Sequence, residues 1–110
     1  MVDENEFRTR SEQALIALQR ALERASDHHD FEVDSNAGAL SIEFADPPAK
    51  FVVSPNAPVR QIWVSARVQS FKFDWNDASA AFALPDGRTL HQLIADVVGE
   101  QLGETVSLSA

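Results

Sequence analysis

The stretch APVRQIWVSARVQSFKFDW, residues 57–75, contains both tryptophans of the chain and its most regular apolar alternation. Strict alternation predicts strands, because successive side chains leave a strand on opposite faces. We therefore predict two neighbouring strands, and the first sends Ile62 and Val64 to one face. In the second strand Phe71 and Phe73 alternate with charged residues, so the aliphatic and phenyl side chains should share the buried face.

Trp63 falls on the opposite, outer face of this predicted sheet. Its neighbours there are polar or basic residues, namely Arg60, Gln61, Ser65, Arg67 and Lys72. A large aromatic residue on a solvent-facing surface is typical of an anchor for a partner protein. The alternative is a tryptophan that is covered by a loop or lies flat against its neighbours. The residues alone leave both interpretations open.

The composition limits the classes of protein that this chain can belong to. Its 110 residues, of which 45% are hydrophobic, are enough for one domain spanning residues 1–110 with a single core. The chain has no cysteine, which excludes disulfides, thiolate metal sites and a thiol nucleophile. It contains no apolar run of membrane-spanning length, and its acidic start is unlike a signal peptide, so we expect a cytoplasmic protein without membrane contact.

The formal net charge of -8 is concentrated in the first part of the chain. Residues 1–46 carry eleven acids and four bases, whereas residues 47–110 carry six acids and five bases. A negative field of this kind repels nucleic acid and anionic membranes, and it attracts cations or basic protein surfaces. The alternative is that these surface carboxylates serve solubility alone.

The rest of the chain predicts two helices and further strands. Residues 3–26 carry an apolar stripe at helical spacing behind a capping pair, Asp3 and Glu6. The pattern predicts a hairpin over residues 31–44, a short strand at residues 50–54 and a weak strand at residues 80–83. Residues 47–48 and Pro55 should bound that short strand.

The last helix should begin at Thr89, where Gln92 completes a capping box, and end at Gly103. The mildly apolar tail after it could fold back along the helices. Because each strand is apolar on one side only, we predict an α+β fold. In this two-layer α/β sandwich, two helices pack on one face of a five- to six-stranded antiparallel sheet, and the other face is left for function.

Four motifs in register resemble the frataxin family, in its bacterial CyaY-type form. They are GALSIEF at residues 38–44, PVRQIWVSA at residues 58–66, FDW at residues 73–75 and GETVSL at residues 103–108. The resemblance covers nearly the whole chain. It implies the frataxin-like sandwich and a monomer. It also implies an accessory role in iron–sulfur cluster assembly: the protein would dock to a cysteine desulfurase and its scaffold protein, and would modulate sulfur transfer or iron delivery.

The resemblance also implies two sites. Iron, as Fe2+ or Fe3+, would bind weakly on an acidic ridge made of Glu23, Asp27, Asp30, Glu32, Asp34 and Glu43. Carboxylate oxygens suit iron, and exposed acids make a shallow, unselective site. The partner surface would be Gln61, Trp63 and Ser65, and we add the nearby bases Arg60 and Arg67 to it.

The chain departs from the family pattern at several positions. Gln19, Arg20, Arg24 and Ser26 dilute the ridge along the end of the first helix, and Ser54 stands where the family has asparagine. These departures imply a lower affinity for iron than is usual in the family. The sequence DHHD adds His28 and His29, which could offer imidazole nitrogens to a metal. The alternative for DHHD is a solvated loop.

No set of residues suggests catalysis, and we expect no enzymatic activity. The chain lacks a glycine-rich phosphate loop. His91 falls on the outer side of the last predicted helix, which favours a surface residue over a general base. Two hypotheses remain: an iron-linked regulator of the desulfurase, and an acidic protein-binding domain that blocks a basic partner surface without any physiological metal.

Overall fold

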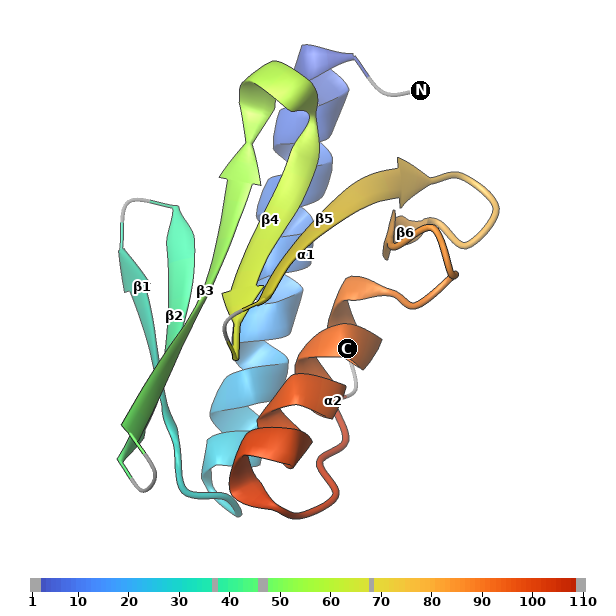
Figure 1. Cartoon of the computed structure of the whole chain (residues 1–110). Helices are drawn as coiled ribbons and strands as arrows, with labels where there is room; N and C mark the ends of the chain where they lie inside the picture. The colour runs from blue at the N-terminus through green and yellow to red at the C-terminus, as the bar shows by residue number, and fades with distance from the viewer. Residues whose placement is uncertain (1–2, 37, 46–47, 68, 109–110) are drawn as a thin grey trace.

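The computed structural model describes residues 3–36, 38–45, 48–67 and 69–108. Along the chain, one α-helix comes before the strands of the sheet and one comes after them (Figure 1). The helices are α1 (Glu4–Ser26) and α2 (Leu90–Leu102). The strands are β1 (Glu32–Asn36), β2 (Ala39–Ala45), β3 (Pro48–Asn56), β4 (Gln61–Ala66), β5 (Gln69–Asn76) and β6 (Ala81–Ala83), and a 3-10 helix (Ala57–Val59) joins β3 to β4.

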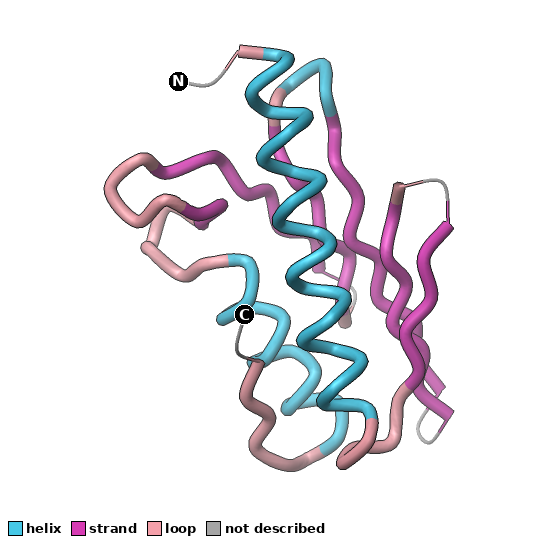
Figure 2. The backbone as a smooth tube through the Cα atoms, turned by 180° about the vertical axis from the view of Figure 1, so that it is seen from behind, coloured by secondary structure: helices cyan, strands magenta, loops and turns pink. Residues whose placement is uncertain are grey.

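All six strands form one antiparallel sheet, and their spatial order follows the chain from β1 to β6. Both helices lie on the same face of this sheet, as the view from behind shows (Figure 2). The core fills the space between the two layers, and its largest fully buried side chains include Phe7, Leu22, Ile62, Phe73 and Ile94. The predicted two-layer α+β sandwich is therefore confirmed, with six strands.

The predicted helix boundaries are also confirmed. The Asp3 side chain accepts a hydrogen bond from the backbone N–H of Glu6, at 2.7 Å, and so caps α1. Thr89 and Gln92 form the reciprocal capping box at the start of α2. Gly103 ends α2 with a φ of 71°, a left-handed conformation that glycine adopts without steric cost.

Strand β3 is longer than predicted, and Pro55 lies inside it rather than after it. Pro55 is opposite Ile62 of β4, whereas the pairing of β2 with β3 reaches only to Val53. Beyond Val53 one side of β3 is a free sheet edge, where a residue without an N–H group is tolerated. The sequence pattern alone could not show that β2 stops first.

The tail after α2 folds back on the helix, as the sequence suggested. Val106 is buried, and Leu108 is partly buried against the core. The tail runs so close to α2 that a Cβ atom on Gly99 would lie 2.7 Å from the carbonyl oxygen of Glu104. Glycine at this position therefore permits the close approach of the two backbones.

Candidate functional site: the open face and the acidic edge of the sheet

Trp63 lies on the sheet face that the helices leave uncovered. It is 38% exposed, and Ser54 of β3 and Lys72 of β5 are its neighbours across the strands. The ammonium nitrogen of Lys72 lies 4.9 Å from the centroid of the indole ring. The predicted exposure is confirmed, and the ring also rests against a neighbour. The ring is thus supported on one side and open to solvent on the other, and its role as an anchor for a partner stays a prediction.

Hydrogen bonds fix the orientation of this indole. Its Nε1–H donates to Oε1 of Gln61 at 3.0 Å, and Nε2 of Gln61 donates to Oδ1 of Asp74 at 3.2 Å. Gln61 is half-buried and Asp74 is exposed. Three side chains on two adjacent strands thus form a chain of hydrogen bonds that ends at the exposed aromatic ring.

A shallow hollow adjoins Trp63 on the same surface. Small side chains form a row across three strands, since Val52 is opposite Ser65 and Ser65 is opposite Ser70. With Trp63 and Lys72 they line a hollow of about 210 Å³. A projecting aromatic ring beside a hollow of small residues is a shape that can interlock with a partner protein.

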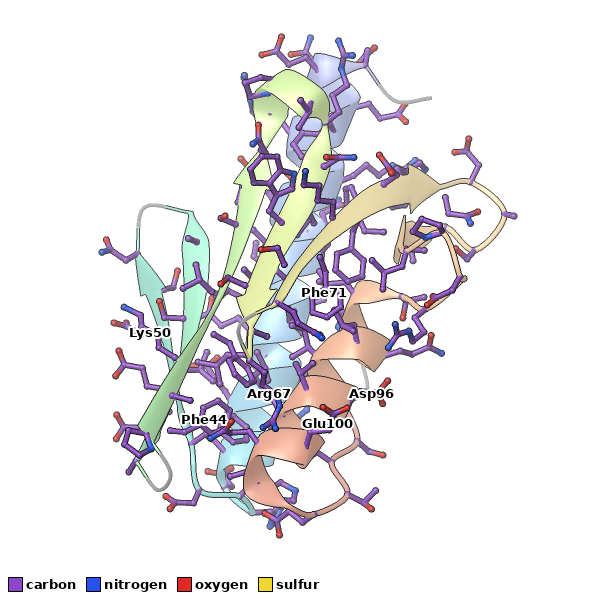
Figure 3. All side chains as sticks on the ribbon, viewed as in Figure 1. Phe44, Lys50, Arg67, Phe71, Asp96 and Glu100 are labelled. Atoms are coloured by element: carbon purple, nitrogen blue, oxygen red, sulfur yellow. The ribbon has the colours of Figure 1, made fainter. Side chains whose placement is uncertain are left out.

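The two predicted basic residues of this surface lie at opposite ends of β4. Arg60 precedes the strand in a left-handed conformation and is exposed. Arg67 follows the strand and turns toward α2, where its guanidinium lies 3.6 Å from the Glu100 carboxylate and donates to Gln101 at 2.9 Å (Figure 3). The structure therefore joins Gln61, Trp63 and Ser65 on one face, and does not bring Arg67 to them.

Four of the predicted metal ligands surround a second hollow, at the β1 edge of the molecule. Glu23 of α1, Glu32 and Asp34 of β1 and Glu43 of β2 line a hollow of about 600 Å³. Glu32 is directly opposite Glu43 in the sheet, a pairing of like charges that costs stability. Lys50, whose ammonium is 4.0 Å from the Glu43 carboxylate, offsets this charge only weakly because both side chains are exposed.

The other four predicted ligands lie in the loop after α1. Asp27, His28 and Asp30 are exposed, whereas His29 is partly buried and its Nδ1 is 2.8 Å from Oε1 of Glu104 in the tail. Among the described residues, no three His, Asp or Glu side chains are grouped so that they could hold a metal ion. The acidic edge is thus an open surface of carboxylates.

One expectation from the sequence is wrong: His91 is not a simple surface residue. Its Nε2 atom is buried and has no hydrogen-bond partner in the described part of the chain. Burial lowers the pKa of His91, and the backbone of Ala17 in α1 acts in the opposite direction. The helical pattern placed His91 outside because it could not show that α1 packs over the first turn of α2.

His91 also lines a hollow that the sequence did not suggest. This hollow of about 490 Å³ lies between α1, β6, the start of α2 and the tail. Arg10, Trp75 and Phe82 are among its lining residues, and the Arg10 guanidinium carbon is 4.6 Å from the centroid of the Trp75 ring.

No helix in the described part of the chain is long and apolar enough to cross a membrane.

These features first define a class of protein, which is a small α+β sandwich with an open aromatic sheet face and an acidic edge. A family description, the frataxin-like domain, matches residues 1–104. The chain is 36% identical over 107 residues to the iron–sulfur cluster assembly protein CyaY of Dechloromonas aromatica, covering 97% of this chain and 99% of that protein. The chain therefore belongs to the frataxin family.

A further relative agrees with this assignment, and a solved structure shares the fold. The iron–sulfur cluster assembly protein CyaY of Azotobacter vinelandii is 34% identical over 90 residues, which cover 79% of this chain and 81% of that protein. A solved structure of frataxin from Psychromonas ingrahamii matches with a TM-score of 0.84, covering 99% of this chain and all of that one. At 19% identity, that structure supports the fold alone.

Proposed function

We propose that this protein is a cytoplasmic accessory factor of iron–sulfur cluster assembly. It docks to a cysteine desulfurase and its scaffold protein, binds iron weakly, and modulates sulfur transfer or iron delivery. It acts as a binding module, without a reaction of its own. The proposal rests on family membership together with the names of the relatives, which describe them as iron–sulfur cluster assembly proteins.

The observation that carries the docking proposal is the exposed indole of Trp63 on the uncovered sheet face. An aromatic side chain that is exposed and already ordered loses little conformational entropy on binding, which makes it an effective anchor. Gln61 and Lys72 hold the ring, and the adjacent hollow can receive a side chain of the partner.

Replacing Trp63 tests this proposal directly. We expect Trp63→Ala to weaken binding to the purified desulfurase–scaffold complex about thirtyfold, as loss of a central interface anchor does. Isothermal titration calorimetry measures this change. Ile16→Ala is the matched control, because Ile16 is also a large exposed apolar residue but lies on α1. Equal affinities of the Trp63→Ala variant and the parent protein would contradict docking through this face.

Iron binding is expected at the hollow lined by Glu23, Glu32, Asp34 and Glu43. Ferrous iron is paramagnetic, so it should broaden the NMR signals of these residues during an anaerobic titration. We do not expect Nδ1 of His29 to be a ligand, because that atom is already hydrogen-bonded to Oε1 of Glu104. Broadening that is uniform over the protein, or absent from the β1 edge, would argue against this site.

A second function remains: the acidic edge blocks a basic surface of the partner and needs no metal. It is favoured by four carboxylates around one hollow and by the absence of a metal-binding cluster among the described residues. In that case the triple variant Asp30→Asn, Glu32→Gln, Asp34→Asn should abolish binding, while Trp63→Ala should not. A desulfurase assay with and without iron separates the two functions, since only the first predicts an effect of iron.

A further inference from the structure

The further inference concerns Asp74, a residue outside the predicted partner surface. Its exposed carboxylate lies on β5, next to the start of β4. It forms no ion pair within the described part of the chain, whereas Asp86, Asp96, Glu100 and Glu104 each have a basic side chain within 4.0 Å. Its hydrogen bond is to Nε2 of Gln61, at 3.2 Å.

This hydrogen bond determines which atom of the Gln61 amide faces the indole N–H of Trp63. An amide side chain has one acceptor oxygen and one donor nitrogen, and a 180° flip exchanges them. The indole Nε1–H can only donate, so it requires the oxygen of Gln61. A carboxylate can only accept, and Asp74 therefore draws the amide nitrogen toward itself and leaves the oxygen for Trp63.

We propose that Asp74 is a positioning residue for docking: through the Gln61 amide it fixes the orientation of the Trp63 indole on the open sheet face. The inference rests on the proposed docking function and adds to it a residue that never needs to touch the partner. The ring is 38% exposed, so few packing contacts are available to orient it and the hydrogen bond to Gln61 matters more. Without Asp74, the amide can flip and the indole loses its acceptor.

Two substitutions of Asp74 separate positioning from charge. Asp74→Asn removes the charge but retains an oxygen that can accept from Gln61, whereas Asp74→Ala removes both. In the free protein, we expect Asp74→Ala to shift the Trp63 indole N–H signal in the NMR spectrum and to speed its exchange with solvent. Asp74→Asn should leave both close to the parent values, and Trp75→Phe assigns the two indole signals. An unchanged Trp63 signal in Asp74→Ala, or an equal change in both variants, would overturn the proposal without involving any partner.

Binding provides the second test. Asp74→Ala should weaken binding to the desulfurase–scaffold complex about three- to tenfold, the usual effect of one lost hydrogen bond, and Asp74→Asn less than twofold. In a Trp63→Ala background, Asp74→Ala should cause no further loss. A full additional loss in that background would show that Asp74 acts independently of Trp63 and would overturn the proposal. If no variant affects binding while the indole signal changes as expected, the positioning stands and the docking function fails.

Discussion

Trp63 and Trp75 lie on opposite faces of the same sheet and are held by similar interactions. Each indole Nε1–H donates to a side chain two residues away, to Gln61 at 3.0 Å for Trp63 and to Asp77 at 2.8 Å for Trp75. Each ring also has a cation over it. The two rings therefore have the same two kinds of support, a hydrogen bond from the indole N–H and a cation over the ring.

The difference between them is what packs against each ring. Trp75 contacts Phe82 edge-on, with ring centroids 5.3 Å apart, and Arg10 reaches it from α1. Trp63 contacts no other aromatic ring in the described part of the protein, and nothing from the helices covers its face. The ring on the covered face is thus part of the packed interior, whereas the ring on the open face stays accessible, which is what the proposed docking requires. Substitutions on the two faces test this division, and two further substitutions test contacts of the helix layer.

The largest expected effect is on the covered face. Phe73 is fully buried, so Phe73→Ala should lower the free energy of unfolding by about 3–5 kcal/mol through lost apolar burial and the cavity left behind. Urea unfolding followed by circular dichroism measures this loss. The adjacent, exposed Lys72→Ala is the control and should change stability by less than about 1 kcal/mol. A similar loss of unfolding free energy in both variants would contradict the view that the covered face contributes more to stability than the open face.

The two tryptophans themselves provide the next test. Trp75→Ala should destabilise the protein by about 2–3 kcal/mol, since Phe82 and Arg10 lose their aromatic partner. Trp63→Ala should cost less than about 1 kcal/mol. Thermal unfolding of both variants under the same conditions makes the comparison. If Trp63→Ala were the more destabilising change, the open face would contribute more to stability than the covered face at these positions, contrary to our prediction.

Gly99 tests the contact between α2 and the tail. Gly99→Ala places a Cβ atom against the carbonyl oxygen of Glu104, so the tail must move and Val106 loses part of its burial. After allowance for the higher helix propensity of alanine, we expect a net loss of about 1 kcal/mol, measured by urea unfolding. Asp96→Ala, on the exposed side of α2, is the control: it measures the gain in helix propensity together with the loss of a weak, exposed ion pair with Arg88. A stabilised Gly99→Ala variant would show that the tail contact contributes little.

The smallest effect concerns pH. Because burial lowers the pKa of His91 in the folded protein, the unfolded chain binds its proton more tightly. Stability should therefore fall as pH decreases below the ordinary histidine value of about 6.5, and the fall should level off below the folded pKa. Comparing the unfolding free energy at pH 7.5 and 5.5 in the parent protein and in His91→Gln measures this contribution. An identical pH dependence in both proteins would contradict it.

The sequence predicted the features that depend on local periodicity. The helix caps at Asp3 and Thr89, the buried stripe of α1 and the outward position of Trp63 are each determined by residues within a few positions of one another. The one-sided apolar pattern of the strands also predicted the two-layer antiparallel sandwich. The structure confirms these features because local preference and tertiary packing agree.

What the sequence did not predict depends on how elements meet. The burial of His91 follows from the packing of α1 against α2, and the direction of Arg67 follows from Glu100 and Gln101 on a helix 33 residues or more away. The hydrogen bonds from Asp74 through Gln61 to Trp63 require the register of β4 with β5. Single-strand alternation assigns a face to each residue but does not show which side chains touch.

The meandering order of the six strands has a consequence for how the protein folds. Every strand pairs with its neighbour in the chain, so each ladder can close a short loop at a small cost in chain entropy. The helices are different, because α1 begins the chain and α2 ends it, with the whole sheet between them. We therefore expect early hairpins and a late transition state in which the two ends of the chain meet.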